Sequence, residues 1–523
     1  MAISADRPIT GAATTDEGAH PTPASQSSGG KGKLGIAGHY LRYSAGNLST
    51  MVAGLVSFPI LTRLLDNTQY GILSYYDTLV LMAVAIGKLG AQHAILRFHP
   101  HDGDPRSMGA FSTNLFYVPF AISMALWLVG VVGLLLWDAA RGSAHAAMLW
   151  LGLAVTPVMI FSSFIETAMR AAEHSGTVMR LRVAWRWLEV GLIVGAVVLL
   201  QPSAVAAYAG KLVAAIAMVV FFVAWMRRNL RFTRSLVDLR QTREGFIYGM
   251  PLVGNEILSV ARVALDRLMI KGLLSDFSAV GVYSIGASLA VQVNVLLNVS
   301  VFETMMPMAN RAYLTEGAAA LRQLKARFLL PMTYAAVAGT CLLACFGSDV
   351  IVALSGSTKS ASGPVFSVLG AVYALQCVLL VSGYGLLLER RSHKIMVLMA
   401  MTLVMNLVLG YWLIPRFGVM GAVYATSVGS LVYAIGHCLW IPREMLQLPD
   451  MRTVVTSTGV ALACAGGAWV AGLFSLQPGW ERLLVGGGAM GVAYVLGVLA
   501  LDGRVRILMM SLLSWRKRPE TAS

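Results

Sequence analysis

Apolar residues dominate the chain in long runs, which short polar or charged turns interrupt. Each run holds about 20 residues, enough for an α-helix rising 1.5 Å per residue to cross the ~30 Å hydrocarbon core of a bilayer. The pattern therefore predicts about fourteen membrane-spanning helices. Their expected positions are 43–63, 73–92, 111–137, 146–169, 181–200, 203–226, 247–270, 280–305, 327–347, 364–388, 395–414, 418–441, 453–474 and 482–501.

The composition agrees with this pattern. Hydrophobic residues make up 57% of the 523 residues, and charged residues only 12%. Soluble globular proteins carry about 25% charged residues. We therefore expect an all-α integral membrane protein.

Basic residues are distributed unevenly around the predicted spans. An even number of spans places both ends of the chain on the same side of the membrane. Most Lys and Arg residues fall in the two tails and in every second loop. The positive-inside rule therefore assigns the tails and these loops to the cytoplasm. The formal charge of +15 is then explained by basic residues that orient the protein in the membrane and bind anionic lipid headgroups, so it does not indicate nucleic-acid binding. The basic residues in the outer loops are Arg63, Arg141, Lys271, Lys359, Arg416 and Arg482.

A basic loop after the sixth span divides the chain into halves. The stretch "LLDNTQYGILS" at 64–74, after the first span, has a loose echo in "LLSDFSAVGVYS" at 273–284, after the seventh. Two parallel six-helix lobes with a binding cavity between them would explain both features. The expected organisation is a disordered cytoplasmic tail at 1–36, an N-lobe at 37–226, a basic linker at 227–246, a C-lobe at 247–445, two further spans within 446–503, and a basic cytoplasmic tail at 504–523.

The seventh span contains four ionisable residues, namely Glu256, Arg262, Asp266 and Arg267. Four charges at the centre of a lipid-exposed helix raise the free energy of membrane insertion by roughly 10 to 14 kcal/mol, whereas its dozen or so aliphatic residues lower it by only roughly 4 to 7 kcal/mol. The helix must therefore turn these groups towards protein or water. Arg262 and Asp266 are four residues apart and can pair on one face, with Glu256 and Arg267 eleven residues apart on nearly the same stripe. A buried structural ion pair with snorkelling ends is the alternative.

Further ionisable residues occur in other spans. They are Lys88 in the second, Glu166 in the fourth, Arg186 and Glu189 in the fifth, Lys211 in the sixth, and Glu303 near the end of the eighth. For each of them alone, a snorkelling or internally paired side chain is an equal alternative. As a set, they predict a polar cavity in which acids hold bases at the wall, ready to give an anionic headgroup or phosphate charge-assisted hydrogen bonds.

Sites for other chemistry are not evident. The lysines near residue 30 lack the glycines and the following Ser or Thr of a phosphate-binding loop, and the five cysteines lie in apolar spans without ligand-like neighbours. We expect no cofactor and no metal site. The outer loops are short, which leaves no room for the catalytic loop of a membrane glycosyltransferase or polymerase, so an enzyme is not expected.

Three stretches resemble the polysaccharide transporter family, the Wzx-type O-antigen and exopolysaccharide flippases of the multidrug/oligosaccharidyl-lipid/polysaccharide exporter superfamily. They are "SFPILTRLLDNTQYGILSYYDTL" (57–79), "ALDRLMIKGLLSDFSAVGVYSIGASLA" (264–290) and "LIPRFGVMGAVYATSVGSLV" (413–432). The resemblance implies a V-shaped bundle of two six-helix lobes plus two C-terminal helices in the bacterial cytoplasmic membrane. Its implied substrate is an undecaprenyl-diphosphate-linked oligosaccharide, flipped to the outer leaflet, with a glycan polymerase and glycosyltransferases as pathway partners.

Site roles follow from combining the charged set with this resemblance. We expect Arg262, Arg267, Arg186, Lys211 and Lys88 to contact the headgroup. The acids would orient these bases or carry a coupled proton or sodium ion, and they are Asp266, Glu256, Glu166 and Glu189. A lipid II flippase and a multidrug antiporter of the same superfamily remain alternatives, and a glycan polymerase or ligase is a more distant one.

Overall fold

The computed structural model describes residues 31–100, 104–141, 146–389, 391–507 and 510, and these residues are helical apart from their connections. The expected tails at 1–36 and 504–523 therefore fall mostly outside the described residues, although helix α1 already begins at Lys31. The longer helices are α1 (Lys31–Leu64), α2 (Asn67–Gly87), α5 (Val118–Arg141), α6 (Ala146–Ala171), α7 (Ser175–Leu199), α8 (Ala204–Asn229), α9 (Leu239–Leu274), α10 (Phe277–Asn294), α11 (Ser300–Ser355), α12 (Gly363–Ser382), α13 (Ser392–Phe417), α14 (Val419–Trp440), α15 (Met451–Val470) and α16 (Gly488–Leu501). Shorter helices are α3 (Ala91–Arg97), α4 (Pro105–Phe111), η1 (Ser112–Tyr117), η2 (Arg234–Leu236), η3 (Val295–Val299), η4 (Ser357–Ser362), η5 (Leu473–Ser475) and η6 (Arg482–Gly487).

Eleven helical segments in the described part of the chain are long and apolar enough to cross a membrane. Helices α1, α7 and α9 occupy the three other expected spans, at 43–63, 181–200 and 247–270. Of these, α7 and α9 carry several charged residues within the helix. The prediction of an all-α integral membrane protein is confirmed, and the charged residues of α7 and α9 make these two helices less lipid-like than the eleven apolar segments.

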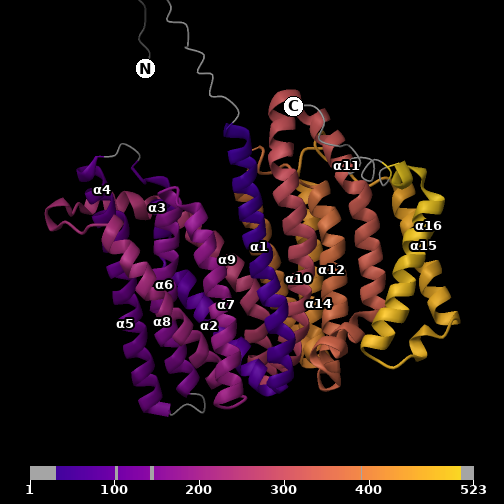
Figure 1. Cartoon of the computed structure of the whole chain (residues 1–523), viewed down its shortest axis with the longest axis horizontal. Coiled ribbons are helices and arrows are strands. Elements are labelled where there is room, and N and C mark those ends of the chain that lie inside the picture. Colours follow the sequence, from indigo (N-terminus) through magenta and orange to yellow (C-terminus); the bar gives the residue numbers. More distant parts are fainter. Residues whose placement is uncertain (1–30, 101–103, 142–145, 390, 508–509, 511–523) are drawn as a thin grey trace, which may run out of the picture.

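Two bundles of helices lie side by side (Figure 1). We call α1 to α8 the N-lobe, and we call the second half of α9 together with α10 to α14 the C-lobe. Helix α9 connects them, because its first half packs on α2 and α3 whereas its second half packs on α13. The segment expected to be a linker, 227–246, is partly helical and is fixed to the N-lobe, where the Asn114 side chain donates to the Leu236 carbonyl at 2.9 Å and to Gln241 Oε1 at 2.8 Å.

The two lobes meet where α2 and α10 begin, in the two stretches that echo each other in sequence. Asp66 caps α2 and Asp276 caps α10, each accepting from backbone N–H groups of the first turn. Gly71 lies against the backbone at Phe277 and Gly281, and Gly281 lies against the Asn67 carbonyl. Equivalent residues of the two halves thus touch one another, as expected for a contact close to a two-fold axis relating the lobes. A side chain at either glycine would separate α2 from α10.

A second contact between the lobes joins the ends of α1 and α11, on the side that the charge distribution predicts to be outside. Arg63 donates from Nε to the Leu354 carbonyl and from Nη2 to the Ala353 carbonyl, both at 2.8 Å. In return, Lys359 Nζ donates to the Leu65 carbonyl at 2.8 Å. A buried Thr62–Ser355 hydroxyl pair completes this contact, which we name the outer latch (Thr62, Arg63, Ser355 and Lys359). Each cation caps a helix C-terminus of the other lobe, where the helix dipole favours positive charge.

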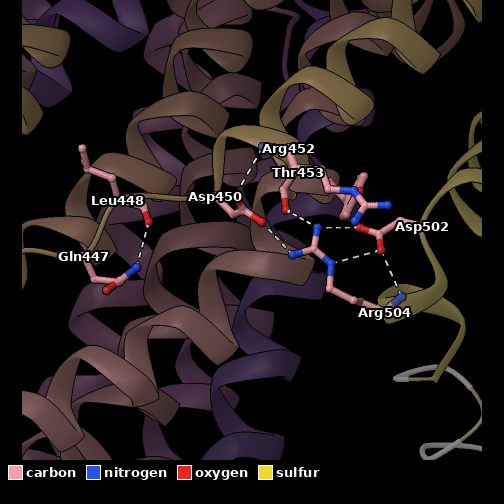
Figure 2. A network of polar contacts seen from close by, with 8 residues as sticks. Gln447, Leu448, Asp450, Arg452, Thr453, Asp502 and Arg504 are labelled. Atoms are coloured by element: carbon pink, nitrogen blue, oxygen red, sulfur yellow. Dashed lines mark hydrogen bonds and ion pairs between the residues drawn. The ribbon is translucent and has the colours of Figure 1, made fainter.

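Helices α15 and α16 are attached to α11 at both of their ends. On one side, Arg482 Nε lies 2.9 Å from Oδ1 of Asp349, a buried residue of α11. On the other side, Arg504 donates to Asp502 and Asp450, and Figure 2 shows the guanidinium between these two carboxylates. Asp502 also accepts from Tyr334 of α11 at 2.8 Å. The hydrogen bonds from Arg504 lower the pKa of the buried Asp502 carboxyl to about 2.

Candidate functional site

A polar cavity of about 550 Å³ lies between the lobes, lined by residues of α1, α2, α7, α8, α9 and α10. Its charged lining residues are Asp77, Arg186, Glu189, Lys211 and Arg267. Hydroxyl and amide groups, including Ser57, Ser74, Thr78, Ser259, Ser288 and Gln292, line the rest of its polar wall. The predicted cavity between two lobes is therefore present. It combines an apolar scaffold with a few convergent polar groups, as small-molecule sites do.

The N-lobe wall of this cavity carries two ion pairs. Arg186 Nη1 lies 2.8 Å from Glu189 Oε2, one turn further along α7. Lys211 of α8 pairs with Asp77 of α2, and the Tyr208 hydroxyl donates to the same carboxylate oxygen at 3.4 Å. The predicted pairing of acids and bases at a cavity wall is thus seen for Arg186, Glu189 and Lys211. Asp77 was not among the predicted residues, because no local spacing connects it with its lysine partner on a distant helix.

The C-lobe wall presents Arg267, and this guanidinium differs from the other cations of the cavity. It donates from Nε to the Ser284 hydroxyl at 3.1 Å and from Nη1 to the Val263 carbonyl at 2.9 Å. No ion pair with a carboxylate is found for it among the described residues. Arginine has five N–H donors. The remaining N–H groups, and a positive charge that no carboxylate contacts directly among the described residues, are available to an anion in the cavity.

Asp266 lies inside the C-lobe, in a small pocket of about 60 Å³ between α9, α10, α12, α13 and α14. Only 4% of the residue is exposed. Its carboxylate accepts from the Tyr283 hydroxyl, from Thr426 Oγ1 at 2.8 Å and from Asn406 Nδ2 at 3.2 Å. All three donors are neutral groups, and no ion pair of this carboxylate is found among the described residues.

The ion pair that the spacing allows between Arg262 and Asp266 is not formed. Spacing of four residues places both side chains on one face of α9, but the donors of α10, α13 and α14 satisfy the carboxylate instead. Arg262 lines the Asp266 pocket, and its guanidinium carbon lies 5.8 Å from the centroid of the Tyr433 ring.

Other predicted residues lie away from the lining of the central cavity. Lys88 pairs with Glu256, which also accepts from Gln92, so this trio fixes the α2–α3 turn to α9. Glu166 pairs with Arg182 at 2.8 Å in a side chamber of about 310 Å³. That chamber shares Arg186, Glu189 and Lys211 with the central cavity. The described residues contain no cluster of His, Cys, Asp and Glu suited to a metal ion.

Comparisons with known proteins agree with this architecture. The profile of the family described as "Polysaccharide biosynthesis protein" matches residues 40–312, more than half of the chain. No curated protein matches the sequence. Among solved structures, the lipid II flippase MurJ in an inward closed conformation aligns with a TM-score of 0.66 and 12% identity, covering 90% of this chain and 99% of its own.

An outward-facing multidrug resistance transporter of the MATE family, in the MOP superfamily, aligns with a TM-score of 0.51 and 15% identity over 76% of this chain and 93% of its own. At these identities the structural matches establish the fold. The chain belongs to the polysaccharide biosynthesis protein family and has the all-helical membrane transporter fold shared by MurJ and the MATE proteins.

Proposed function

We propose that the protein is a flippase that moves an undecaprenyl-diphosphate-linked oligosaccharide repeat unit from the cytoplasmic to the outer leaflet, for surface polysaccharide biosynthesis. The family supports the pathway, and the fold shared with a lipid II flippase supports a lipid-linked substrate. Arg267 carries the proposal, because it offers the inter-lobe cavity a positive charge for which no carboxylate partner is found among the described residues. A diphosphate is the part of the substrate that requires such a charge.

Each part of the substrate has a suitable environment. Arg267 binds the diphosphate, and Arg186 and Lys211 turn from Glu189 and Asp77 towards it as it enters. The sugar hydroxyls exchange water for the serine, threonine and glutamine side chains of the cavity wall.

The lipid tail stays in the bilayer, beside the two C-terminal helices. There α15 and α16 form an apolar groove of about 490 Å³ lined largely by Gly and Ala residues. Small residues let an extended hydrocarbon chain approach the helix backbones closely, so that van der Waals packing holds a tail that is already in an apolar environment.

Asp266 carries the coupling ion. Two hydroxyl groups and one amide NH₂ donate to this carboxylate, an arrangement that suits a proton, whereas a hard cation such as sodium would require these groups to turn their oxygen atoms towards it. The pocket and the central cavity share Arg267 and Val263 in their walls. Neutralising Asp266 changes the local field at Arg267, which links ion binding to anion affinity.

The setting follows from the same proposal. The protein lies in the bacterial cytoplasmic membrane with both termini in the cytoplasm. It receives its substrate from glycosyltransferases and passes it to a polysaccharide polymerase, and it catalyses no covalent step itself. Alternating access then requires the α2–α10 contact and the outer latch to open towards the outer leaflet.

Export of surface glycan tests the proposal. Replacing Arg262 and Arg267 together with Gln should stop export while protein abundance stays normal, whereas Arg416→Gln should leave export intact, because Arg416 stacks on Trp412 at the surface. Unchanged export in the double variant removes these arginines from the mechanism. Drug resistance on overexpression would identify a multidrug antiporter instead. A requirement for cell-wall synthesis under all conditions would identify a lipid II flippase. Shortened polymer with intact translocation would identify a polymerase or ligase.

A further inference from the structure

Ser284 lies on α10 one turn beyond Gly281, within the contact between the two lobes. Its counterpart in the other half is Ser74, one turn beyond Gly71 on α2. The two hydroxyls meet, with Ser74 Oγ 2.8 Å from Ser284 Oγ. Ser284 is fully buried, whereas Ser74 also lines the central cavity.

The same Ser284 oxygen accepts the Nε–H of Arg267 at 3.1 Å. Ser74, Ser284 and Arg267 therefore form a continuous chain from α2 of the N-lobe, through α10, to α9 of the C-lobe. A second bond from Nη1 to the Val263 carbonyl fixes the other edge of the guanidinium. With two edges fixed, the orientation of the planar fork is set, and its remaining donors are pre-organised for a ligand.

We propose that Ser284 is a positioning residue that holds the Arg267 fork for a phosphate-type anion, and that Ser74 ties this orientation to the contact between the lobes. The inference rests on the proposed function, since it gives a role to a residue that acts through Arg267. The Ser284 oxygen accepts from both Ser74 and Arg267, so the Ser74 hydroxyl holds this oxygen in place. When α2 moves away from α10, Ser284 loses that contact and can turn away from Arg267, so the guanidinium is held less firmly. Separation of the lobes at this contact thereby weakens the hold on the anion, which favours its release.

Equilibrium binding of undecaprenyl diphosphate to the full-length protein in nanodiscs tests this directly. Ser284→Ala should weaken binding about tenfold, because a hydrogen bond to a charged group contributes about 1.5 kcal/mol or more. Ser74→Ala should weaken it by a smaller factor, because the bond from Arg267 to Ser284 survives. Ser278→Ala is the matched control on the same helix, because its hydroxyl is not part of this chain, and it should bind like the wild type.

The decisive comparison places each serine variant in an Arg267→Gln background. If Ser284 acts through Arg267, both serine substitutions lose their effect there. An equal loss of affinity in both backgrounds overturns the positioning role and leaves the proposed function standing. No loss of affinity in Arg267→Gln alone overturns the anion-binding role of Arg267, and with it this inference. Should Ser284→Ala fail to fold, Ser74→Ala in the two backgrounds separates the same outcomes.

Discussion

Removal of Lys359 from the outer latch should shift the protein towards a state whose cavity is open to the predicted outer side. Lys359 is only 5% exposed, and its Nζ donates to the Leu65 carbonyl at 2.8 Å. Hydrogen bonds to charged groups contribute about 1.5 to 3 kcal/mol, and loss of one partner also leaves the buried carbonyl unsatisfied. Lys359→Met retains the aliphatic stem and removes only this bond. Because the bond is already broken in an outward-open state, the closed state loses about 10- to 150-fold in relative population.

The assay is the labelling rate of a single cysteine in the cavity. Ser288→Cys, in a background without the five native cysteines, reports entry of a membrane-impermeant thiol reagent added from outside. Lys359→Met should raise this rate about tenfold or more, as long as the closed state dominates. Arg416→Gln removes an exposed cation that stacks on Trp412 and should leave the rate unchanged. Equal rates in Lys359→Met and the parent would refute the assignment of Lys359 to the gate.

Three further predictions concern the buried groups. Asp266→Asn should abolish the dependence of transport on a proton or sodium gradient in proteoliposomes, because the amide cannot carry the negative charge. Gly281→Ala should lower the unfolding temperature, since its Cβ would meet the backbone of α2 and overpacking costs about 1 to 3 kcal/mol, whereas Gly191→Ala, with open space around it, should not. Asp502 has a pKa of about 2 in the folded protein, below the value of about 3.9 expected in the unfolded chain. Its ionised carboxylate therefore stabilises the folded state by about 1 to 2 kcal/mol above pH 4, and this stabilisation is lost as the pH falls towards 2. Arg504→Gln should remove this loss from the acid arm of the unfolding curve.

Much of the architecture could be predicted from the sequence because the membrane imposes a simple rule on it. A run of apolar residues long enough to cross the bilayer is visible without knowledge of any contact. The charged residues of α9 could likewise be assigned to protein or water from their cost in lipid, and Arg267 does line the cavity. Arg186, Glu189 and Lys211 gather at the same cavity for the same reason.

The pairing of these charges could not be predicted, because it depends on distances between helices. Local spacing allowed Arg262 as the partner of Asp266, but neutral groups on other helices, namely the Tyr283 hydroxyl, the Asn406 amide and the Thr426 hydroxyl, donate hydrogen bonds to the Asp266 carboxylate instead. Lys88 and Glu256, both assigned to the cavity from their depth in a span, fix the α2–α3 turn to α9 instead. Before the turn, where Leu64–Leu65 align with Leu273–Leu274, Asp266 and Arg267 correspond to Ser57 and Phe58, so the two halves carry different chemistry on a shared scaffold.

Translocation by the purified protein tests the central claim most directly. The protein would be reconstituted in liposomes with a fluorescent undecaprenyl-diphosphate-linked oligosaccharide, and a membrane-impermeant quencher would report how much label crosses to the opposite leaflet. We predict that the wild type equilibrates the label between the leaflets and that Arg267→Gln does not, at equal protein content. Equilibration by Arg267→Gln at the wild-type rate would contradict the claim that this positive charge in the inter-lobe cavity carries the substrate across.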